Sequence, residues 1–323
     1  MTKRFDVVAF GELVVDLIPA ASVSGNLLFK AIAGGAPGNV AAGVARLGQR
    51  AAMLSKVGPG PLGSLLIEAL ERAGVETRGI VRSKVNPTAL AVVSLNPAGE
   101  SDFMLYRDGC ADSRYEPGEV ALDIAGACRV LHVGSLSLGS PLSAQAQRLA
   151  VKTAKKAGAL ISTDVNFRPA IWNNPGMMHA TGREAIASAD IVKVSAEELL
   201  ALAPAADTAS AVRSLWHSGL KIFAVTHGAR GAELFTARCH VSIAGFPVKV
   251  ADTVGCGDAF MAALLVGLSL ERLATSNEEE LYNIGRAACA AGAAVARVVG
   301  AMEHMPRRQD INALIADVDN AGS

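Results

Sequence analysis

Short runs of Val, Ile and Leu alternate with helix-length segments along most of this chain. The predicted strands are residues 5–10, 130–133, 160–165, 191–194 and 222–226, and the predicted helices include residues 39–48, 141–156, 211–217 and 259–270. Strands that alternate with helices form a mostly parallel sheet with helices on both faces. The sequence therefore predicts a Rossmann-like α/β fold.

Composition fits one large domain of this kind. Of the 323 residues, 51% are apolar but only 4% are aromatic. The core must therefore consist mainly of Ala, Val, Leu and Ile, as in buried parallel strands covered by Ala-rich helices. No internal repeat or low-complexity linker divides the chain, and we expect a single domain over residues 1–323.

Charge and cysteine spacing argue against several classes of protein. Thirty basic residues balance thirty acidic ones, whereas nucleic-acid binders and polybasic membrane anchors carry clustered Lys and Arg. The five cysteines form no CxxC pair, which indicates free thiols rather than disulfides or a zinc site. Glu12 and Asp16 interrupt the N-terminal apolar stretch, so it is not a signal peptide, and Ala287–Ala296 is too short to span a bilayer. We predict a cytoplasmic protein that binds neither nucleic acid nor membrane.

Two segments break the alternation and are predicted β-hairpins. Leu13–Ala33 follows the first strand, and Ala89–Arg107 has strand-like runs on either side of the turn Asn96–Gly99. They could form an antiparallel edge of the main sheet, or a small β lid over its carboxyl-terminal edge, where open α/β sheets bind ligands. We favour the lid, because both hairpins adjoin candidate site residues.

The segment Asp252–Asp258 (DTVGCGD) carries the most informative chemistry. It precedes an apolar helix, where glycines let backbone N–H groups surround an anion and the helix dipole adds partial positive charge. Asp258, in the first turn, either only complements the dipole or acts as a general base. An anion hole of Gly255, Cys256 and Gly257 beside a base suits phosphoryl transfer to a hydroxyl.

A second glycine-rich junction is Ala33–Asn39 (AGGAPGN), between a strand and a helix. Gly34 and Gly35 allow close approach of the backbone to a ligand. Asn39 either caps the helix or offers a donor and an acceptor to sugar hydroxyls, and Asp16 is either a surface charge of the lid or an acceptor for hydroxyls. Together with Asp258, these residues favour a sugar site.

In this order and at this spacing, the two segments resemble the two signatures of the ribokinase (PfkB) family of carbohydrate kinases. The resemblance covers essentially the whole chain, and the segments 103–112, 164–172 and 193–199 are most similar to fructokinases. It implies a ribokinase-like fold with a β-sheet lid formed by about residues 13–33 and 89–107. It also implies ATP and Mg²⁺ as cofactors and the phosphorylation of a hydroxyl of a small sugar, with fructose as the first candidate.

The resemblance further implies roles for individual residues. Asp258 would be the base, and the anion hole would be Gly255, Cys256 and Gly257. The sugar would be bound by Asp16, Gly34, Gly35, Asn39, Arg107, Asn166 and Arg168, and the nucleotide by Ser195, Thr226, Gly228, Gly231 and Asn283. Glu198 would organise the metal ion through water, a K⁺ site near Asp252 and Val254 is left open, and the lid implies a homodimer.

Cys256 stands where the family usually has alanine. It is either a tolerated small apolar residue or a thiol whose pKa is lowered by the helix N-terminus, so that its alkylation would block activity.

Other classes of enzyme with a similar fold require motifs of their own. A dinucleotide-dependent oxidoreductase needs GxGxxG after the first strand, and a P-loop kinase needs GxxxxGK[ST]; the sequence contains neither in the required place. A non-catalytic sugar or nucleotide sensor on the same fold remains the alternative from another class, although Asp258 and its glycines are all present. Among kinases, ribose, 2-keto-3-deoxygluconate and aminoimidazole riboside remain alternative substrates, since Arg107 and Arg168 suit an acidic sugar as well as a phosphate.

Overall fold

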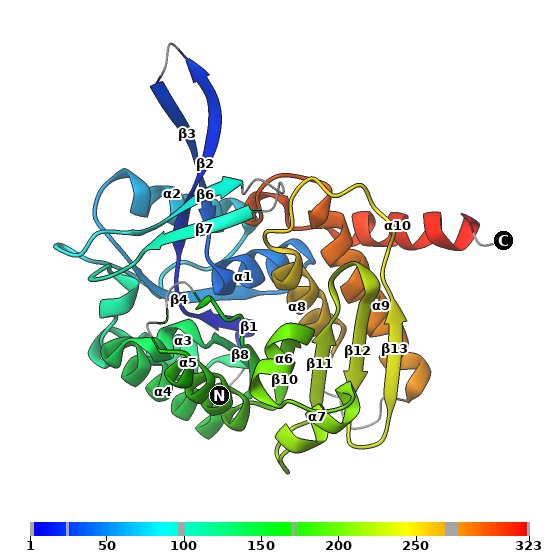
Figure 1. The fold of residues 1–323 in the computed structure, drawn as a ribbon. Coiled ribbons are helices and arrows are strands. Elements are labelled where there is room, and N and C mark those ends of the chain that lie inside the picture. Colours follow the sequence, from blue (N-terminus) through cyan, green and yellow to red (C-terminus); the bar gives the residue numbers. More distant parts are fainter. Residues whose placement is uncertain are drawn as a thin grey trace.

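A nine-stranded sheet runs through the centre of the molecule (Figure 1). In this computed structural model, residues 3–321 are described apart from 24–25, 96–100, 170–171, 173 and 269–276. The strands are parallel except that β12 is antiparallel to both of its neighbours. Their order across the sheet is β13 (His240–Ala244), β12 (Gly231–Phe235), β11 (Ile222–Thr226), β10 (Ile191–Ser195), β9 (Leu160–Asp164), β8 (Cys128–Gly134), β1 (Phe5–Phe10), β4 (Ala51–Val57) and β5 (Ile80–Arg82).

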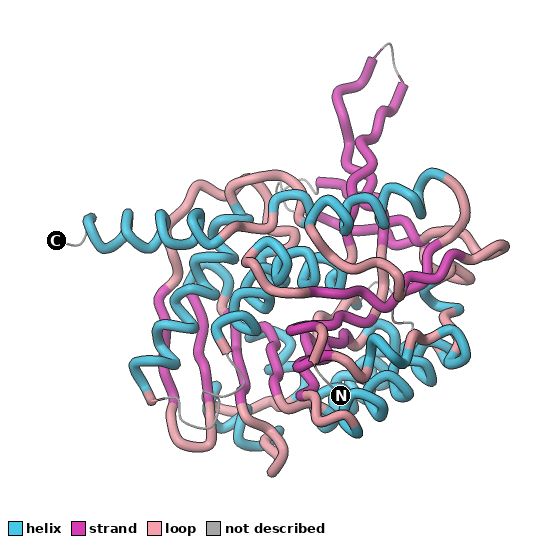
Figure 2. Tube along the Cα trace, turned by 180° about the vertical axis from the view of Figure 1, so that it is seen from behind, coloured by secondary structure: helices cyan, strands magenta, loops and turns pink. Residues whose placement is uncertain are grey.

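Helices cover both faces of this sheet (Figures 1 and 2). Successive side chains of a strand point to opposite faces, so Val7 and Ala9 of β1 belong to one core cluster, and Val8 and Phe10 to the other. One face is covered by α1 (Ala36–Arg46), α2 (Pro61–Ala73), α8 (Cys256–Gly267), α9 (Glu278–Ala296) and α10 (Arg308–Ala321). The other face is covered by α3 (Leu122–Ala125), α4 (Pro141–Lys156), α5 (Pro175–Ser188), α6 (Ala196–Leu202) and α7 (Thr208–Leu215). The predicted α/β fold is confirmed.

The two predicted hairpins form a second sheet that stands apart from the main one. Its order is β3 (Asn26–Gly34), β2 (Val14–Val23), β6 (Ala89–Leu95) and β7 (Ser101–Tyr106), with β2 parallel to β6 and each hairpin antiparallel. The β2–β3 hairpin projects beyond the body of the molecule (Figures 1 and 2). The alternative that the hairpins extend the main sheet is therefore wrong. The predicted turn Asn96–Gly99 lies outside the described residues.

Helix starts near the glycine-rich junctions differ from the prediction. α1 begins at Ala36 rather than Asn39, because Pro37, whose fixed φ suits a first helical turn, lies inside the helix. α8 begins at Cys256 rather than Ala259, which places Asp258 in its first turn. The predicted end of this helix at Leu270 lies outside the described residues. The first shift places Asn39 one turn inside α1, and the second confirms Asp258 in the first turn of α8.

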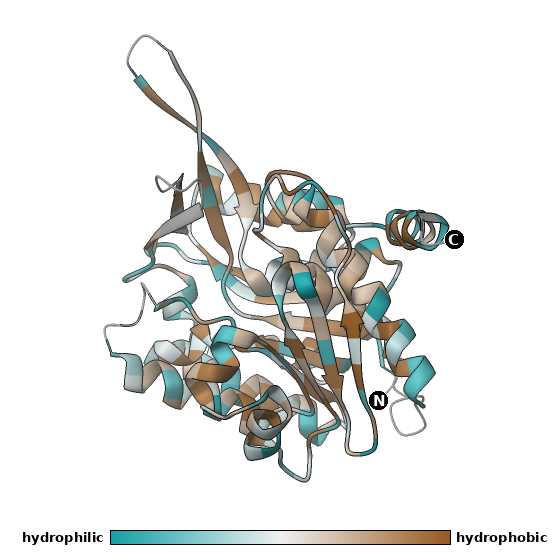
Figure 3. Cartoon of the chain, turned by 45° about the vertical axis from the view of Figure 1, so that its right-hand side comes forward, coloured by the Kyte–Doolittle hydropathy of each residue, from teal (hydrophilic) through white to brown (hydrophobic). Residues whose placement is uncertain are grey.

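The C-terminal helix α10 is amphipathic, as expected from residues 311–318. Ile311 and Leu314 pack on the core, whereas Asn312 and Asp317 lie on other sides of the helix. Figure 3 shows this helix nearly end-on, with apolar residues on one side and hydrophilic residues on the other. Within the described ranges, none of the helices combines the length and apolar character needed to cross a membrane.

Candidate active site

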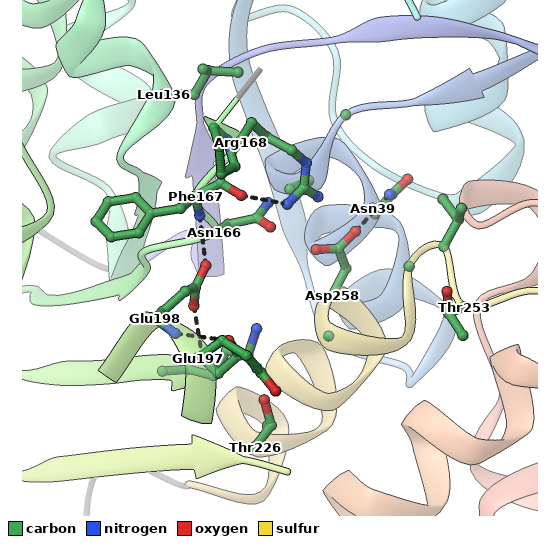
Figure 4. A pocket seen from close by; sticks show the side chains of 18 of the residues that line it. Asn39, Leu136, Asn166, Phe167, Arg168, Glu197, Glu198, Thr226, Thr253 and Asp258 are labelled. Carbon is green, nitrogen blue, oxygen red and sulfur yellow. Dashed lines mark hydrogen bonds between the residues drawn. The ribbon is translucent and has the colours of Figure 1, made fainter. Parts of the chain in front are cut away.

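A cavity of about 860 Å³ lies between the carboxyl ends of the central strands and the second sheet. Its walls come from β2, β6 and β7, the start of α1, the loops after β9, β10 and β11, and the start of α8. Parallel strands bring the loops at their carboxyl ends to one edge of the sheet, which explains why segments from both ends of the chain meet here. Figure 4 shows the side chains that face this space.

Asp258 reaches the cavity from the first turn of α8 (Figure 4). Gly255 precedes this turn with φ 81°, a left-handed conformation that favours glycine. Asp258 is 8% exposed. Burial raises its pKa above the ordinary value, while the hydrogen bond from Asn39 and the charges of Lys193 and Arg168 oppose the rise. A raised pKa suits a base that takes a proton from a hydroxyl near neutral pH.

Asn39 connects the first turn of α1 to this carboxylate. Its Nδ2 donates a hydrogen bond to Oδ2 of Asp258 at 2.7 Å. Its Oδ1 is buried without a hydrogen-bond partner among the described residues. The interpretation of Asn39 as a helix cap is wrong, because Gly35 occupies the N-cap of α1. The side chain instead holds Asp258 and presents an unsatisfied acceptor beside the cavity.

Asp16 lines the cavity from β2 and is 8% exposed, so it is not a surface charge of the second sheet. Burial, together with the negative charges of Asp258 and Asp252, raises its pKa to about 7. A Cβ atom on Gly34 would overlap the carboxylate of Asp16. Gly35 has φ 104°, and a Cβ there would lie 2.6 Å from the carbonyl oxygen of Glu12. Gly34 therefore makes room for the Asp16 side chain on β2 and Gly35 for the Glu12 backbone in the loop before it, and of the two glycines only Gly35 lines the cavity.

The loop after β9 brings Asn166 and Arg168 into the cavity (Figure 4). Asn166 has φ 46° and is the one non-glycine residue with a positive φ in the described part of the chain. Such strained residues persist where the surrounding structure fixes them, often at functional sites. The loop is fixed by Glu198, whose Oε1 accepts a hydrogen bond from the Phe167 amide at 2.6 Å.

Arg107 does not line the cavity, contrary to the expected contact with substrate. It is 7% exposed and forms an ion pair with Asp112. The pair uses its Nε, while its Nη2 is buried without a hydrogen-bond partner among the described residues. The contact of Arg107 with substrate stays a prediction.

Lys193 and Asp164 form a buried pair that sequence reasoning did not assign. Nζ of Lys193 donates to both carboxylate oxygens of Asp164, at 3.1 and 2.9 Å. A Cβ atom on Gly257 would lie 2.9 Å from this Nζ, so the ammonium group lies against the predicted anion hole. Burial lowers the pKa of Lys193, but the charges of Asp164, Glu198 and Asp258 outweigh burial and raise it above its ordinary value. A lysine inside the apolar strand β10 was the available signal, because buried lysines are nearly always paired.

The predicted nucleotide residues divide into two groups. Ser195, Thr226 and Gly228 line the cavity, and Ser195 lies opposite Thr226 in the register of β10 and β11. Gly231 and Asn283 are not part of this lining. Gly231 begins β12 with φ 107°, where a Cβ would collide with the backbone of β13, and Asn283 is exposed on α9.

Glu198 is held mainly by backbone groups. Its Oε1 and Oε2 accept hydrogen bonds from the amides of Phe167 and Ser195, at 2.6 and 2.7 Å, and the Ser195 hydroxyl in turn accepts from the Glu198 amide at 3.2 Å. Over the described ranges, no group of three or more His, Cys, Asp or Glu side chains is arranged to hold a metal ion. Mg²⁺ commonly keeps several waters and binds through few carboxylates and the phosphates of a substrate. The donor set therefore fits an ion bound indirectly and does not fit an all-protein cage.

Cys256 does not have the properties of a reactive thiol. Its side chain packs against the core, and burial, with the charges of Asp258 and Asp252, raises its pKa to about 12. The hypothesis of a lowered thiol pKa is wrong, because burial and two carboxylates outweigh the helix N-terminus. Its amide donates to the Thr253 carbonyl at 3.3 Å. The next amides of the first turn, those of Gly257 and Asp258, have no intrahelical acceptor.

Comparison with known proteins gives a consistent result. Residues 4–308 match the pfkB family of carbohydrate kinases. The chain is 38% identical over 316 residues to fructokinase-2 of Solanum habrochaites, covering 96% of this chain and 95% of that protein.

Solved structures with the same fold cover nearly the whole chain. A fructokinase from Xylella fastidiosa with bound ATP superposes with a TM-score of 0.87 at 30% identity, over 97% of this chain and 99% of that one. A ribokinase II from E. coli, described as putative and in complex with ATP and Mg²⁺, gives 0.85 at 26% identity, over 97% and 99%. A double mutant of the fructokinase from Vibrio cholerae O395, in a form with fructose, ADP and potassium ion bound, gives 0.83 at 30% identity, over 97% and 99%.

Proposed function

The chain belongs to the pfkB family of carbohydrate kinases, and we propose that this ATP-dependent sugar kinase phosphorylates fructose. Full-length similarity to fructokinases, one of them with fructose bound, supports this choice of sugar. One observation carries the reaction type: Asp258, at the start of α8, and Thr226, at the end of β11, line a single cavity (Figure 4). Asp16 lines the same cavity from β2.

Asp258 acts as the general base in this proposal. Its carboxylate accepts the proton of the acceptor hydroxyl while that oxygen attacks the γ-phosphorus of ATP. Asn39 holds the carboxylate through the 2.7 Å hydrogen bond to Oδ2, which leaves Oδ1 available for the sugar hydroxyl. Since the base is buried, its proton affinity lies closer to that needed at neutral pH.

The start of α8 and Lys193 stabilise the transferring phosphoryl group. The Gly257 and Asp258 amides supply donors at the positive end of the helix dipole. Lys193 adds a full positive charge beside Gly257, and Asp164 fixes its position. Mg²⁺, when bound with ATP, neutralises phosphate charge, and Glu198 orients its waters.

The sugar lies on the side of the cavity formed by Asp16, Asn39, Asn166 and Arg168. Asp16 accepts hydrogen bonds from sugar hydroxyls, and Arg168 reaches the phosphoryl group as it transfers. The second sheet, which supplies Asp16, Ala91 and Leu105 to the cavity, serves as a lid that excludes water. On the nucleotide side, Ser195, Thr226 and Gly228 contact ATP, with Gly231 and Asn283 at the periphery.

A K⁺ site lies near Asp252 in this proposal. The Asp252 carboxylate accepts hydrogen bonds from the amides of Val254 and Gly300, at 3.0 and 3.1 Å, and so joins two loops behind the anion hole. A cation bound there would stabilise the same loops. We also propose a reducing, cytoplasmic location, which the five free cysteines support.

An assay of ADP release from Mg-ATP against fructose, ribose, 2-keto-3-deoxygluconate, inosine and aminoimidazole riboside tests the choice of sugar. We expect kcat/KM to be highest for fructose and turnover to be lost when EDTA removes Mg²⁺. A higher kcat/KM for any other acceptor would contradict fructose as the substrate.

A further inference from the structure

Both carboxylate oxygens of Glu198 have partners within the protein, which the expected role in organising a metal ion through water does not explain. Oε1 accepts from the Phe167 amide at 2.6 Å, and Oε2 accepts from the Ser195 amide at 2.7 Å. The Ser195 contact is local, because Glu198 is the third residue of α6 and completes a capping box. The Phe167 contact joins residues 31 positions apart and connects α6 to the loop after β9. A helix cap alone does not require this second contact.

The amide that Glu198 holds lies between two residues that line the cavity. Asn166 precedes Phe167 and Arg168 follows it, and both belong to the lining (Figure 4). Nη1 of Arg168 donates to the Phe167 carbonyl at 3.0 Å, so the backbone is held on both sides of the Phe167 Cα atom. Glu198 therefore acts on the segment from which Asn166 and Arg168 extend.

The Phe167 side chain anchors the same segment in the core. It is 7% exposed and belongs to the core cluster that includes Leu199 and Leu202 of α6. A Cβ atom on Gly182 of α5 would lie 2.5 Å from Cζ of the Phe167 ring, and this ring packs against His179 with centroids 5.9 Å apart. With the ring fixed in this way, the hydrogen bond from the amide sets the orientation of the backbone beside the cavity.

The backbone before Phe167 has a conformation that it would not keep by itself. Asn166 has φ 46°, in the left-handed region, which is costly for a residue other than glycine. Such residues persist where neighbouring contacts fix them, and Glu198 holds the next amide along the chain. Without this hydrogen bond the loop would relax, and a bound sugar would have to restore the conformation of Asn166.

We propose that Glu198 is a positioning residue for the sugar: its Oε1, by holding the Phe167 amide, keeps Asn166 and Arg168 oriented toward the sugar side of the cavity. This inference rests on the proposed sugar kinase activity. It gives Glu198 a task that needs neither ATP nor Mg²⁺, in addition to the orientation of metal-bound waters. Because Oε2 holds the Ser195 amide, the same carboxylate ties the sugar side of the cavity to the nucleotide side.

The test is the affinity for fructose in EDTA and without nucleotide, measured by calorimetry for wild type and Glu198→Ala. Under these conditions a residue that acts only through the metal ion has no effect. We expect the Kd for fructose to rise about 5- to 30-fold, because sugar binding would have to restore the left-handed conformation of one residue. An unchanged Kd in the folded variant would overturn the proposal.

Two further variants separate this role from the loss of a helix cap. Glu119 is also the third residue of a helix, η2 (Pro117–Glu119), and its Oε2 accepts from the N-cap amide of Glu116 at 2.8 Å, but it lies outside the cavity lining. Glu119→Ala should therefore keep the wild-type Kd. Glu198→Asp keeps the charge, but its carboxylate is too short by one methylene to hold both amides, so the Kd should rise. If Glu198→Ala does not fold, Glu198→Asp decides by the same criterion.

The choice of sugar is tested separately by the assay of acceptors. If another acceptor has the higher kcat/KM, the calorimetry uses that sugar, so the two proposals fail by different results. A rise in Kd that Glu119→Ala shares would indicate a general loss of stability and would overturn the positioning role. A rise that is confined to the Glu198 variants and is present without Mg²⁺ supports it.

Discussion

At the scale of single residues, the site depends on carboxyl groups kept away from water. Burial raises the pKa values of Asp258, Asp16 and Glu12, and Asn39 and Lys193 limit the rise for Asp258. A carboxylate that would be a weak base in water thus becomes suited to proton transfer near neutral pH. Burying these carboxyl groups lowers the free energy of unfolding. Hydrogen bonds with a bound sugar would offset part of that loss.

The first prediction concerns pH. An acid whose pKa is raised in the folded protein keeps its proton to higher pH, and a base works only when ionised. We therefore expect kcat/KM for fructose to fall as pH decreases, with a midpoint well above pH 4, where an ordinary aspartate titrates, because the pKa of Asp16 is about 7 and that of Asp258 is also raised. Rates from pH 5 to 9 at constant ionic strength check this. A flat profile down to pH 5 would contradict it.

The second prediction concerns Asn39. Asn39→Ala removes the donor to Oδ2 of Asp258, which leaves the base less well oriented and raises its pKa further. We expect kcat to fall about 10- to 100-fold and the acid limb of the pH profile to move to higher pH. Asn86→Ala, whose hydrogen bond to the Gly109 carbonyl lies outside the cavity, is the matched control. A loss of rate without movement of the acid limb would mean that Asn39 does not act through Asp258.

At the scale of elements, the strand-to-helix junctions position the chemistry. The glycines at the end of β3 and the start of α8 allow β2, α1 and α8 to meet at one edge of the main sheet. At these glycines, an added Cβ atom would meet neighbouring atoms of the chain. Gly35, for example, faces the Glu12 carbonyl, and Gly257 faces Lys193.

The third prediction separates crowding from backbone strain. Gly35→Ala places a Cβ 2.6 Å from the Glu12 carbonyl oxygen at φ 104°, whereas Gly48→Ala has φ 88° and nothing within 4 Å. Left-handed backbone alone costs about 1–2 kcal/mol, so Gly48→Ala should lower the free energy of unfolding by about that amount with normal KM values. Gly35→Ala should cost more and also raise the KM for sugar. Denaturant unfolding and steady-state kinetics measure both, and equal effects of the two variants would refute the crowding argument.

The elements also show what the sequence could and could not predict. Strands 5–10 and 222–226 and helix 141–156 were predicted with the bounds that the structure has, because apolar runs and the flanking glycine or proline mark their ends. β12 and β13 were not predicted, since each has only five residues and Glu233 interrupts the apolar run of β12. Asp258 and Asp16 lie in local motifs that can be read directly. The role of Lys193 depends on its contact with the distant Asp164, which a local pattern does not contain.

At the scale of the whole molecule, the second sheet leaves an open edge. Among the described strands, β3 pairs with β2 alone, and its residues Leu27, Leu28 and Phe29 are 82%, 44% and 42% exposed. The hydropathy view shows apolar residues along this projecting hairpin (Figure 3). Open edges with exposed apolar residues favour pairing with another chain. We propose that a second copy covers this edge, as the predicted homodimer requires.

The fourth prediction tests that dimer. Replacing both Leu27 and Phe29 by Lys puts charge on one face of β3 and should convert a dimer into a monomer, as measured by light scattering with size-exclusion chromatography. Leu200→Lys, on the exposed face of α6, is the control and should remain dimeric. A monomeric wild type, or a dimeric double variant, would contradict the lid interface.

The most direct test of the central claim is turnover by Asp258→Asn, measured with the fructose affinity from calorimetry. Asp310→Asn is the control, because it makes the same change in the first turn of another helix, outside the cavity. A general base contributes about 10²–10⁴-fold, so Asp258→Asn should lose that much of kcat while binding fructose with near-normal affinity, and Asp310→Asn should keep its rate. Near-normal turnover by Asp258→Asn would show that Asp258 only complements the dipole of α8 and would contradict its role as the base.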